Sequence, residues 1–554
     1  MGNYTTVFTT AQIITQLTTT WGGEQQGSTM TWAPGPISYA INTGVPPIPV
    51  PRGEGVGQQS MTSTQVALTQ LSFQLWGDLI SRQLVNVGTL PTANITLNYS
   101  STTDEDGTYA VPGLTSPRPS ADKTFTFTSD RIWLANNSDW PNNVNPTINN
   151  YGLTTMVHEV GHALGLSHPG PYNATPGVEF TYTGYAQFSQ DTRQYNIMSY
   201  FGVYALFRID ILGNLSPGEG WTTDTNPGDV VFYAQTPMVY DIAAIQKLYG
   251  ANMTTRSGDT IYGFHSNVGG TEQAIYDFSM NKAPIFTIWD AGGNNTIDGS
   301  LCTSAQMINL TPGSYSNVDG MIQNIAIAFN CIIQNAIGGN GNDILIGGNL
   351  GKVFSFTGGK GNDTITGGTV GISTSNYSGI LGDYTVTISS SISATIQDNT
   401  ANRDGTDSLT NVQRLHFTNV NNALDIAPNQ NAGSVYMLYQ AAFNRVADLA
   451  GMGYWLAQVD NGVNIVTGVA QSFVNSPEFI TKYGANPSNN TFVSELYQNV
   501  LHRVGDAGGI AYWEGQLNTG ATKALVLEQF ATLPEGAALV AQTISHGIQY
   551  TLVA

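Results

Sequence analysis

The chain has 554 residues, of which 41% are apolar and only 10% are charged, and 38 acidic against 18 basic side chains give a formal net charge of −20. One compact core does not hold so long a chain, so several domains are expected. The acidic balance argues against nucleic acid and anionic membranes as partners, and no apolar run reaches the roughly 18 residues of a membrane span. The acidity suits binding of hard cations by carboxylate oxygens, or it simply keeps the protein soluble.

Four compositional zones follow one another along the chain. Residues 1–250 mix aromatic, aliphatic and polar residues as an α/β enzyme domain does, and residues 251–370 are short β-like runs separated by Gly-rich turns. Residues 371–428 alternate Ser, Thr, Ile and Val as short strands do, and residues 429–554 change to a helical period. We therefore predict a multidomain protein with an α+β domain, a Gly-rich β domain, a β-rich connector that continues it and an all-α C-terminal domain.

The strongest motif is the segment HEVGHALGLSH, which begins at His158. Residues four apart share one face of a helix, so His158 and His162 can present ring nitrogens to the same point. Glu159 is placed to reach a water bound to a metal there. Gly165 can adopt a positive φ, end the helix and turn the chain back, so that His168 closes the site.

These residue types predict a catalytic zinc site. Three neutral imidazoles leave zinc an open position for water, whose pKa the metal lowers toward about 7 while it polarises a scissile carbonyl. Glu159 would take the proton of that water and pass it to the leaving amine. The chain has only seven histidines, and three of them fall in this window, which argues against three rings packed without a metal.

The motif resembles that of the metzincin metallopeptidases, in which HExxHxxGxxH is followed by a methionine turn. The turn is present as NIMSY around Met198. Within the metzincins the chain is similar to the serralysins, bacterial secreted proteases with a calcium-binding β-roll. The likeness rests on HPG from His168, DTR from Asp191 and DIAAIQKLYGAN from Asp241, and it covers residues 10–370.

The resemblance implies a metzincin catalytic domain over residues 1–250 and a parallel β-roll or β-sandwich with RTX calcium repeats over residues 251–370. It further implies that Met198 forms a hydrophobic floor beneath the zinc. Tyr200 would be a fourth, displaceable zinc ligand that hydrogen-bonds the tetrahedral oxyanion after it leaves the metal. The family binds substrate as an extra strand at a sheet edge, for which the candidate residues are Tyr109, Ala110 and Val111.

The N-terminal region and one residue near the site depart from the family pattern. The expected first helix, around residues 11–21, starts close to Met1, so we expect no latency by a pro-segment. Residues 1–6 have neither a basic start nor an apolar run, which does not fit a cleavable secretory signal. Pro171 replaces the acidic residue common after HPG, which is expected to alter the rim of the cleft.

Two segments fit the calcium-binding nonapeptide GGxGxDxUx, namely GGNGNDILI from Gly338 and GGKGNDTIT from Gly358. The glycines expose carbonyls and the aspartate supplies a carboxylate, so these turns should order on binding calcium. The intervening residues 347–357 lack the aspartate, which predicts a short β-roll with few ions. The predicted ligands are Gly339, Gly341, Asp343, Gly359, Gly361 and Asp363.

A second kind of calcium site is implied by the resemblance alone. Its ligands, mainly oxygens from two loops, would come from Arg256, Gly258 and Thr260 on one loop and from Asp290, Gly292, Gly293 and Asn295 on the other. Asn295 stands where the family has Asp, which should weaken the site without abolishing it. Nearby, Cys302 and Cys331 either form a disulfide or remain two buried thiols.

The last zone contains an internal repeat with a constant offset of 58 residues. Five residue types recur in it, as Tyr439, Arg445, Asp448, Trp455 and Gly462 and then as Tyr497, Arg503, Asp506, Trp513 and Gly520. Each unit is typical of helix, loop and helix, and we interpret its Arg, Asp and Trp as structural, an ion pair and a core aromatic. The zone looks like an uncharacterised domain found beside calcium repeats in secreted bacterial proteins, which suggests a cell-surface or matrix partner.

We therefore predict a secreted, extracellular zinc endopeptidase that acts on protein or peptide substrates and is stabilised by calcium. The β-roll without an N-terminal signal resembles substrates of the type I secretion machinery, and the apolar tail at residues 550–554 is compatible with that route. Two alternatives stay open. One is a surface or S-layer-associated calcium-binding protein with an inactive protease domain, and the other is a secreted factor that acts mainly on its own chain.

Overall fold

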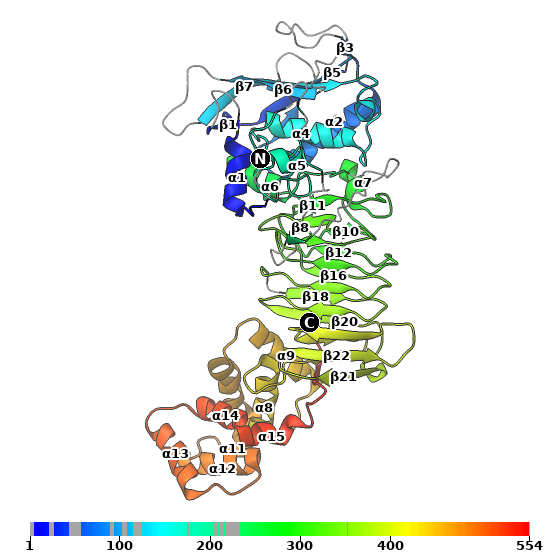
Figure 1. Cartoon of the computed structure of the whole chain (residues 1–554). Coiled ribbons are helices and arrows are strands. Elements are labelled where there is room, and N and C mark those ends of the chain that lie inside the picture. Colours follow the sequence, from blue (N-terminus) through cyan, green and yellow to red (C-terminus); the bar gives the residue numbers. More distant parts are fainter. Residues whose placement is uncertain are drawn as a thin grey trace. The chain divides into compact units, whose positions relative to one another are not determined.

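The computed structural model describes residues 5–21, 27–43, 57–88, 93–101, 124–173, 178, 180–202, 233–351 and 353–552, together with the backbone of the strands at 108–114, 208–209 and 215–216. The chain divides into two compact units (Figure 1). The first unit comprises residues 1–302 and 306–335. The second unit comprises residues 303–305 and 336–554.

A seven-stranded sheet forms the upper part of the first unit. Its order is β1-β7-β5-β2-β4, with β3 paired to β5 and β6 paired to β7. All pairs are parallel except those made by β3 and β6. The strands are β1 (Thr29–Trp32), β2 (Ile37–Ile41), β3 (Gln58–Gln59), β4 (Leu84–Asn86), β5 (Ile95–Ser100), β6 (Thr108–Leu114) and β7 (Thr124–Ala135).

Helices pack against this sheet, and α2 lies beside α4. Two of them begin at capping boxes, in which Thr9 pairs with Gln12 and Thr62 with Gln65, because each threonine and glutamine satisfies the other's backbone N–H. The predicted first helix is confirmed as α1. The helices are α1 (Thr10–Thr19), α2 (Ser63–Gly77), α3 (Pro141–Val144), α4 (Tyr151–Ala163), α5 (Tyr182–Tyr185) and α6 (Val239–Tyr249).

Short elements complete the first unit. A parallel pair, β10 and β12, and a small sheet, β11-β15-β14, follow α6 in the chain. The elements are β8 (Arg208–Ile209), β9 (Leu215–Ser216), β10 (Ile261–Gly263), η2 (Gly270–Glu272), α7 (Gln273–Tyr276), β11 (Phe286–Ile288), β12 (Thr296–Asp298), β13 (Met307–Asn309), β14 (Tyr315–Ser316) and β15 (Ile325–Ile327).

The second unit begins with two stacks of parallel strands. One stack runs β16-β18-β20-β24 and continues into antiparallel β25 and β26, and the other runs β17-β19-β23 and continues into antiparallel β22 and β21. The strands are β16 (Asn335–Ile337), β17 (Ile344–Ile346), β18 (Val353–Thr357), β19 (Thr364–Thr366), β20 (Ile372–Asn376), β21 (Tyr384–Ile388), β22 (Ser393–Asp398), β23 (Thr406–Thr410), β24 (Arg414–His416) and β25 (Asn421–Ala423), with the 3-10 turn η3 (Leu381–Asp383) before β21.

Helices form the rest of the second unit, around one apolar core. They are α8 (Asn431–Phe443), α9 (Leu449–Asp460), the π-helical turn η4 (Ile465–Ala470), α10 (Gln471–Val474), α11 (Pro477–Tyr483), α12 (Asn489–Leu501), α13 (Ala507–Asn518), α14 (Lys523–Thr532) and α15 (Pro534–Ala541). No single helix among the described residues is long and apolar enough to cross a membrane, and one bent pair, α14 with α15, meets the criterion by length and composition.

The prediction of an all-α zone misses one strand. β26 (Ile548–Tyr550) pairs antiparallel with β25, and its two outer residues are buried. Three residues carry no strand period of their own, and the partner strand lies far away in the sequence, so local pattern does not reveal this pairing. Of the predicted export tail, residues 550–552 are described, and residues 553–554 lie outside the described residues.

The repeated aspartates act as helix caps. Asp448 accepts a hydrogen bond from the N–H of Gly451 at the start of α9, and Asp506 accepts one from Gly509 at the start of α13. Each carboxylate therefore satisfies an unpaired donor of the first helical turn. The aspartates therefore have the predicted structural role, but mainly as helix caps. Nη1 of the repeat arginines lies 3.8 and 3.9 Å from their carboxylate oxygens, which is a long ion pair.

The repeat arginines pair mainly with glutamates that the sequence comparison missed. Arg445 pairs with Glu478 and Arg503 with Glu535, each at 2.7 Å from Nε. These glutamates are 57 residues apart, not 58, so the constant offset does not find them. The repeat tryptophans pack in the apolar core as predicted. Trp455 packs on Phe473, and Trp513 packs on Phe530.

The two cysteines are not joined by a disulfide. Cys302 and Cys331 are both buried thiols, and burial raises the pKa of the Cys331 thiol to about 12. Of the two alternatives left open by the sequence, the structure has the second.

Candidate metal centre

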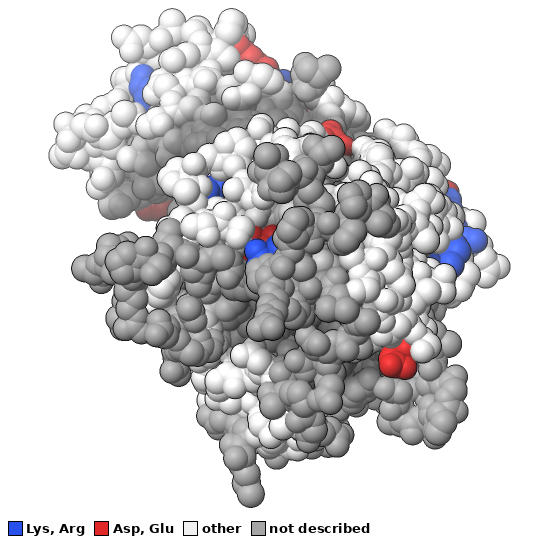
Figure 2. Space-filling view, turned by 90° about the horizontal axis from the view of Figure 1, so that it is seen from above, with Lys and Arg blue, Asp and Glu red and all other residues white. Residues whose placement is uncertain are grey.

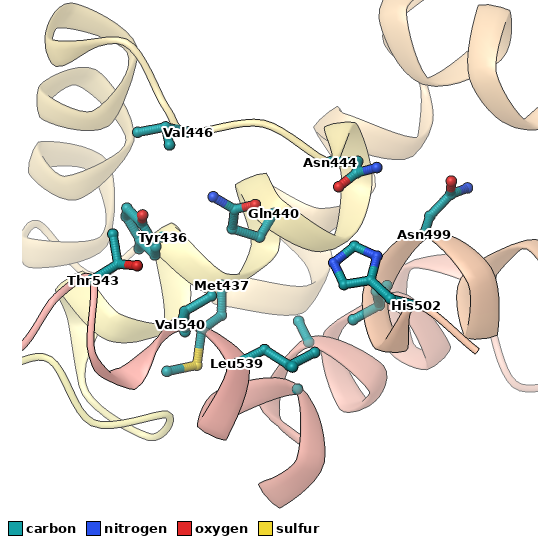
Figure 3. Close-up of a pocket in the computed structure, with 13 residues that line it drawn as sticks. Tyr436, Met437, Gln440, Asn444, Val446, Asn499, His502, Leu539, Val540 and Thr543 are labelled. Carbon is teal, nitrogen blue, oxygen red and sulfur yellow. The ribbon is translucent and has the colours of Figure 1, made fainter.

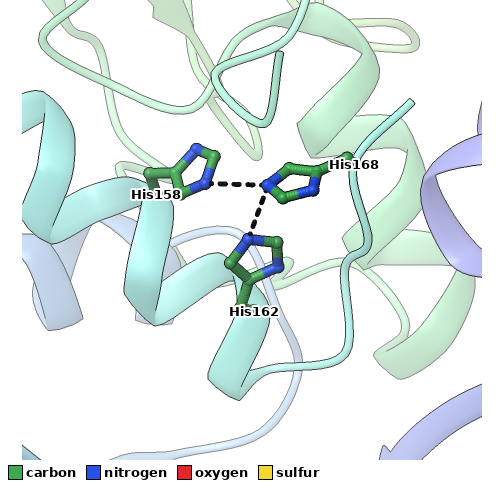
Figure 4. A group of neighbouring side chains, drawn as sticks. All are labelled: His158, His162 and His168. Atoms are coloured by element: carbon green, nitrogen blue, oxygen red, sulfur yellow. Dashed lines mark hydrogen bonds between the residues drawn. The ribbon is translucent and has the colours of Figure 1, made fainter. Parts of the chain in front are cut away.

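Three histidines converge beside α4 (Figure 4). His158 and His162 lie one turn apart on the helix, and the chain reverses at Gly165, whose φ is +104°. A Cβ at Gly165 would lie 2.2 Å from the Met30 carbonyl oxygen, so only glycine fits this turn. Nε2 of His168 then lies 3.1 Å from Nε2 of His162 and 3.3 Å from Nε2 of His158.

Backbone carbonyls fix which nitrogen of each ring points inward. Nδ1 of His158 lies 2.9 Å from the Ile197 oxygen, and Nδ1 of His162 lies 2.7 Å from the Leu166 oxygen. Nδ1 of His168 lies 2.7 Å from the Tyr172 oxygen. A carbonyl only accepts, so each Nδ1 carries the proton and each Nε2 turns a lone pair toward the centre.

Burial keeps the three imidazole rings in their neutral form. Burial lowers the pKa of His162 to about 4. Burial, followed by the neighbouring histidines, holds the pKa values of His158 and His168 well below the usual range. Neutral imidazole is the form that ligates zinc.

The donor set fits a zinc ion. Three nitrogens bound tetrahedrally at about 2.0–2.1 Å from one ion lie about 3.3 Å apart, close to the separations seen here. Three lone pairs that face one another at this distance repel unless a cation lies between them. In the described part of the chain, no other group of three or more His, Cys, Asp or Glu side chains brings its ligand atoms so close.

Glu159 is buried beside this centre, with 6% of its surface exposed. Burial, followed by the charge of Asp130, raises the pKa of Glu159 to about 8. A carboxyl with such a pKa exchanges protons near neutral pH, as a general base requires. The sequence analysis did not single out Asp130. This residue lies on β7, and its position beside Glu159 follows only from how the sheet packs against α4.

The methionine turn lies under α4. Met198 is fully buried, and a Cβ at Gly161 would lie 2.7 Å from its Sδ, so the absence of a side chain at Gly161 admits the methionine. Asp241, at the start of α6, accepts hydrogen bonds from the N–H groups of Ile197 and Met238. The turn is thereby tied to α6, a role that the sequence analysis had not given to Asp241.

A second buried carboxylate ties the third histidine to the same turn. Asp191 accepts hydrogen bonds from the hydroxyls of Tyr172, at 2.6 Å, and Ser199, at 2.9 Å. Tyr172 also supplies the carbonyl that orients His168. The Tyr200 ring centroid lies 4.4 Å from that of His168 and 6.3 Å from that of His158, next to the centre as a displaceable ligand must be.

The predicted substrate edge falls on β6. This strand runs antiparallel to β7 and pairs with no other described strand, and it contacts α4. The backbone of residues 109–111 is therefore at an edge near the zinc helix. The side chains of these residues lie outside the described ones.

The two loops predicted to bind calcium in the first unit lie together. The N–H of Thr260 donates to Oδ1 of Asn295, whose Nδ2 donates to the Gly292 carbonyl. A Cβ at Gly293 would lie 2.2 Å from the Gly258 carbonyl oxygen. Asn295 thus helps to link the two loops, together with the hydrogen bond from the N–H of Asn294 to Oδ1 of Asp259.

Two further predicted residues of that site, Asp290 and Arg256, form hydrogen bonds and ion pairs within the protein. Asp290 accepts from the N–H of Gly292 and from the hydroxyl of Tyr262. The Arg256 guanidinium is 2.7 Å from both Asp78 and Glu272, so its side chain serves as an ion-pair partner and only its backbone oxygen is left for a metal.

The two nonapeptide turns of the second unit stack on each other. The N–H of Asp343 donates to Oδ1 of Asp363, and the N–H of Lys360 donates to the Gly339 carbonyl. A Cβ at Gly361 would lie 2.1 Å from the Gly341 oxygen. The structure brings all six predicted ligand residues into two adjacent turns.

A pocket of about 180 Å³ lies between the helical repeats (Figure 3). Asn444 and His502 line it at equivalent positions, because they end α8 and α12 with left-handed φ values of 49° and 52°. Seen from above, the molecule shows only scattered charged side chains among the described residues on the face that Figure 2 draws.

Comparisons with known proteins find two matching family models and several similar proteins. Residues 251–449 match the family model "Peptidase M10 serralysin C terminal", and residues 427–472 and 470–540 match "Domain of unknown function (DUF4214)". Serralysin B of Dickeya chrysanthemi is 37% identical over 356 residues, which are 62% of this chain and 64% of that protein.

Two further relatives are similar over shorter spans. Metallopeptidase AprA of Pseudomonas marginalis is 39% identical over 54% of this chain and 57% of its own length, and Serralysin A of Dickeya chrysanthemi is 40% identical over 52% and 54%. The family model that matches residues 251–449 and the relatives named here are all metallopeptidases of the serralysin type. The chain is similar to the serralysin-type metalloproteases, and it spans about three fifths of the length of the first of these relatives.

Proposed function

We propose that the chain is a secreted, zinc-dependent endopeptidase that hydrolyses peptide bonds in extracellular proteins. The observation that carries the proposal is the convergence of three Nε2 lone pairs, 3.1 and 3.3 Å apart, beside the buried carboxyl of Glu159. This combination leaves room for a water and a base next to the metal. The similarity to serralysins supports the same activity.

The mechanism assigns one task to each group. A zinc ion bound by His158, His162 and His168 would supply a Lewis acid that acidifies water and polarises the scissile carbonyl. Glu159 takes the proton of the attacking water and returns it to the leaving amine. Tyr200 donates a hydrogen bond to the oxyanion, and β6 holds the peptide as an added strand.

The remaining parts of the proposal concern calcium, export and partners. We propose that residues 338–363 form a calcium-stabilised parallel β-roll and that the chain leaves the cell by type I export. The helical repeats, with the pocket of Figure 3, would attach the enzyme to a cell surface or matrix. Support for calcium binding is the match of residues 251–449 to the serralysin C-terminal family model.

The decisive experiment compares the purified chain with Glu159→Gln on casein. We expect kcat/KM to fall roughly 10²–10⁴-fold, because only the proton transfer is lost, while zinc measured by elemental analysis stays at one per chain. Glu514→Gln, which removes the same charge from a half-exposed position on α13, should cleave casein like the wild type.

The length of the chain itself is followed on the same gels. Intact casein with a wild-type chain that shortens, and a Glu159→Gln chain that does not, would replace the proposal by self-processing. Zinc-loaded wild-type protein that cleaves neither would leave a binding protein with an inactive protease domain.

A further inference from the structure

The strand register of the second unit contains a third turn in line with the two nonapeptides. Ile344 pairs with Thr364, which in turn pairs with Ser408, so the aspartates that precede them occupy equivalent positions. The N–H of Asp363 donates to Oδ1 of Asp407 at 3.0 Å, just as the aspartate of the first turn donates to Asp363. Asp407 therefore continues the column of carboxylates.

The glycine of this turn also occupies the equivalent position. A Cβ at Gly405 would lie 1.8 Å from the Gly361 oxygen, and a Cβ at Gly361 would lie 2.1 Å from the Gly341 oxygen. One residue further on, Oδ1 of Asn362 accepts from the N–H of Thr406, and the asparagine of the first turn accepts from Asn362 in the same way. Residues 402–407 thus stack on residues 358–363 as those stack on residues 338–343, and we call these three segments the turn ladder.

The nonapeptide pattern does not find the third turn for two reasons. Asp407 follows Asp363 by 44 residues, whereas Asp363 follows Asp343 by 20, because β21 and β22 are inserted after β20, the counterpart of β18. Asn402 and Arg403 stand where the first two turns have two glycines. Asn402 has a left-handed φ of 60°, which the equivalent Gly338 and Gly358 do not have, so the third turn begins with a different backbone conformation.

Among the described residues, neither Asp363 nor Asp407 forms an ion pair with a basic side chain. Asp363 and Asp407 are 1% and 2% exposed, and Oδ2 of Asp363 is buried without a hydrogen-bond partner. This oxygen points into the hollow of its own turn, where a Cβ at Gly358 would lie 2.0 Å from it. Arg403, the basic residue of the third turn, is committed to Asp383 and Asp398. A buried carboxyl in this state either takes up a proton or is stabilised in its charged form by a cation.

We propose that residues 402–407 close an additional calcium site against residues 358–363, with Asp363 and Asp407 as its carboxylate ligands and turn carbonyls as the others. All donors are oxygens, and a site of flexible turns suits calcium better than the strict octahedron of magnesium. The inference rests on the proposed calcium binding by the two nonapeptides and adds one ion per chain to it.

The test is calcium stoichiometry by equilibrium dialysis of the full chain against calcium alone, followed by elemental analysis. Asp407→Asn keeps the oxygen that accepts from the Asp363 N–H and removes the charge. It should lose one calcium per chain or bind one ion at least tenfold more weakly. Asp343→Asn should weaken the site of the nonapeptide pair, and Asp139→Asn, an exposed aspartate of the first unit, should bind calcium like the wild type.

The outcomes separate the inference from what it rests on. Wild-type stoichiometry and affinity in Asp407→Asn, with a loss in Asp343→Asn, would overturn the third turn alone. A wild-type chain that binds no calcium would overturn the β-roll proposal as well. If Asp407→Asn does not fold, hydrogen exchange of the unmodified chain decides: peptides spanning residues 402–410 should gain protection at the calcium midpoint of residues 358–366, and unchanged exchange would refute the site.

Discussion

The histidine centre of the first unit and the turn ladder of the second are the two proposed cation sites, and their side chains are held in place in different ways. Backbone carbonyls from Ile197, Leu166 and Tyr172 orient the three rings, and burial keeps the rings neutral. In the turn ladder the donors are carboxylates. Burial, together with the charge of Asp363, raises the pKa of Asp407 to about 8. The fold alone therefore holds the first site in shape, whereas we expect the shape of the second to depend on the charge of a bound ion.

The largest expected effect is on activity at the histidine centre. His162→Ala should lose zinc and reduce casein cleavage to background, because two imidazoles do not hold the metal and its water in place. Its far-UV circular dichroism should match that of the wild type. The fold orients the His162 ring, and we expect the secondary structure not to depend on that ring.

His416→Ala provides the control for this variant. His416 is an exposed histidine on β24, so zinc content and activity should stay unchanged. A His162→Ala chain that unfolds would show that the centre is not preformed, and the contrast with the turn ladder would fail.

Calcium removal should have the next largest effect, and on structure first. Chelation with a calcium-selective chelator should increase hydrogen exchange and proteolytic cleavage within residues 338–410, because the buried carboxylates then repel one another. Exchange in α4 should change later or not at all. Equal loss of protection in α4 and in the turn ladder would contradict the comparison.

The calcium-free chain should also show a characteristic pH dependence. Burial raises the pKa of Asp363 to about 6 and that of Asp407 to about 8, above the 3.8 of an unperturbed aspartate. A carboxyl with a raised folded-state pKa stabilises the fold fully below pH 3.8, and this contribution is lost as the pH rises toward 8.

The measurement is thermal unfolding of the second unit's signal without calcium at several pH values. The midpoint should fall between about pH 4 and pH 8, and saturating calcium should remove most of that fall. A midpoint that rises over this window would show that the two carboxyls are not buried as described.

The sequence predicted those features that local geometry controls. The spacing of His158 and His162 on one helix, the left-handed turn at Gly165 and the stacking of the two nonapeptides needed only helix periodicity and glycine chemistry. The roles of these residues as metal ligands stay predictions. The braces of the site, Asp191 and Asp241, were quoted in motifs without a role, because their partners are set by tertiary packing.

Long-range pairing hid other features. β26 pairs with β25 across the whole helical zone, and Asp407 follows the second nonapeptide only after the two inserted strands β21 and β22. Neither has a local pattern strong enough to predict its partner.

A preformed histidine centre should be sensitive to packing beneath it. Gly161→Ala gains helix propensity of up to about 1 kcal/mol, yet its Cβ would lie 2.7 Å from Sδ of Met198 and 3.0 Å from Trp76. Overpacking costs about 1–3 kcal/mol, so we expect a net loss of stability of about 1 kcal/mol with reduced activity. Urea unfolding and casein cleavage measure the two.

Gly515→Ala is the matched control, because Gly515 lies inside α13 and its Cβ would meet nothing within 4 Å. This variant should gain about 0.5–1 kcal/mol from propensity alone. If both variants gain stability equally, the methionine is not held tightly under the helix.

The smallest effect is expected where charges are neither buried nor near an ion. Arg445 and Glu478 pair at 2.7 Å with side chains 41% and 47% exposed. A double-mutant cycle with Arg445→Met and Glu478→Gln should give a coupling of about 0.2–1 kcal/mol in urea unfolding, because water competes for both groups. The coupling should shrink further at 1 M salt. A larger coupling that does not change with salt would mean that burial does not separate strong from weak charge pairs in this molecule. The contrast between the histidine centre and the turn ladder would then need another cause.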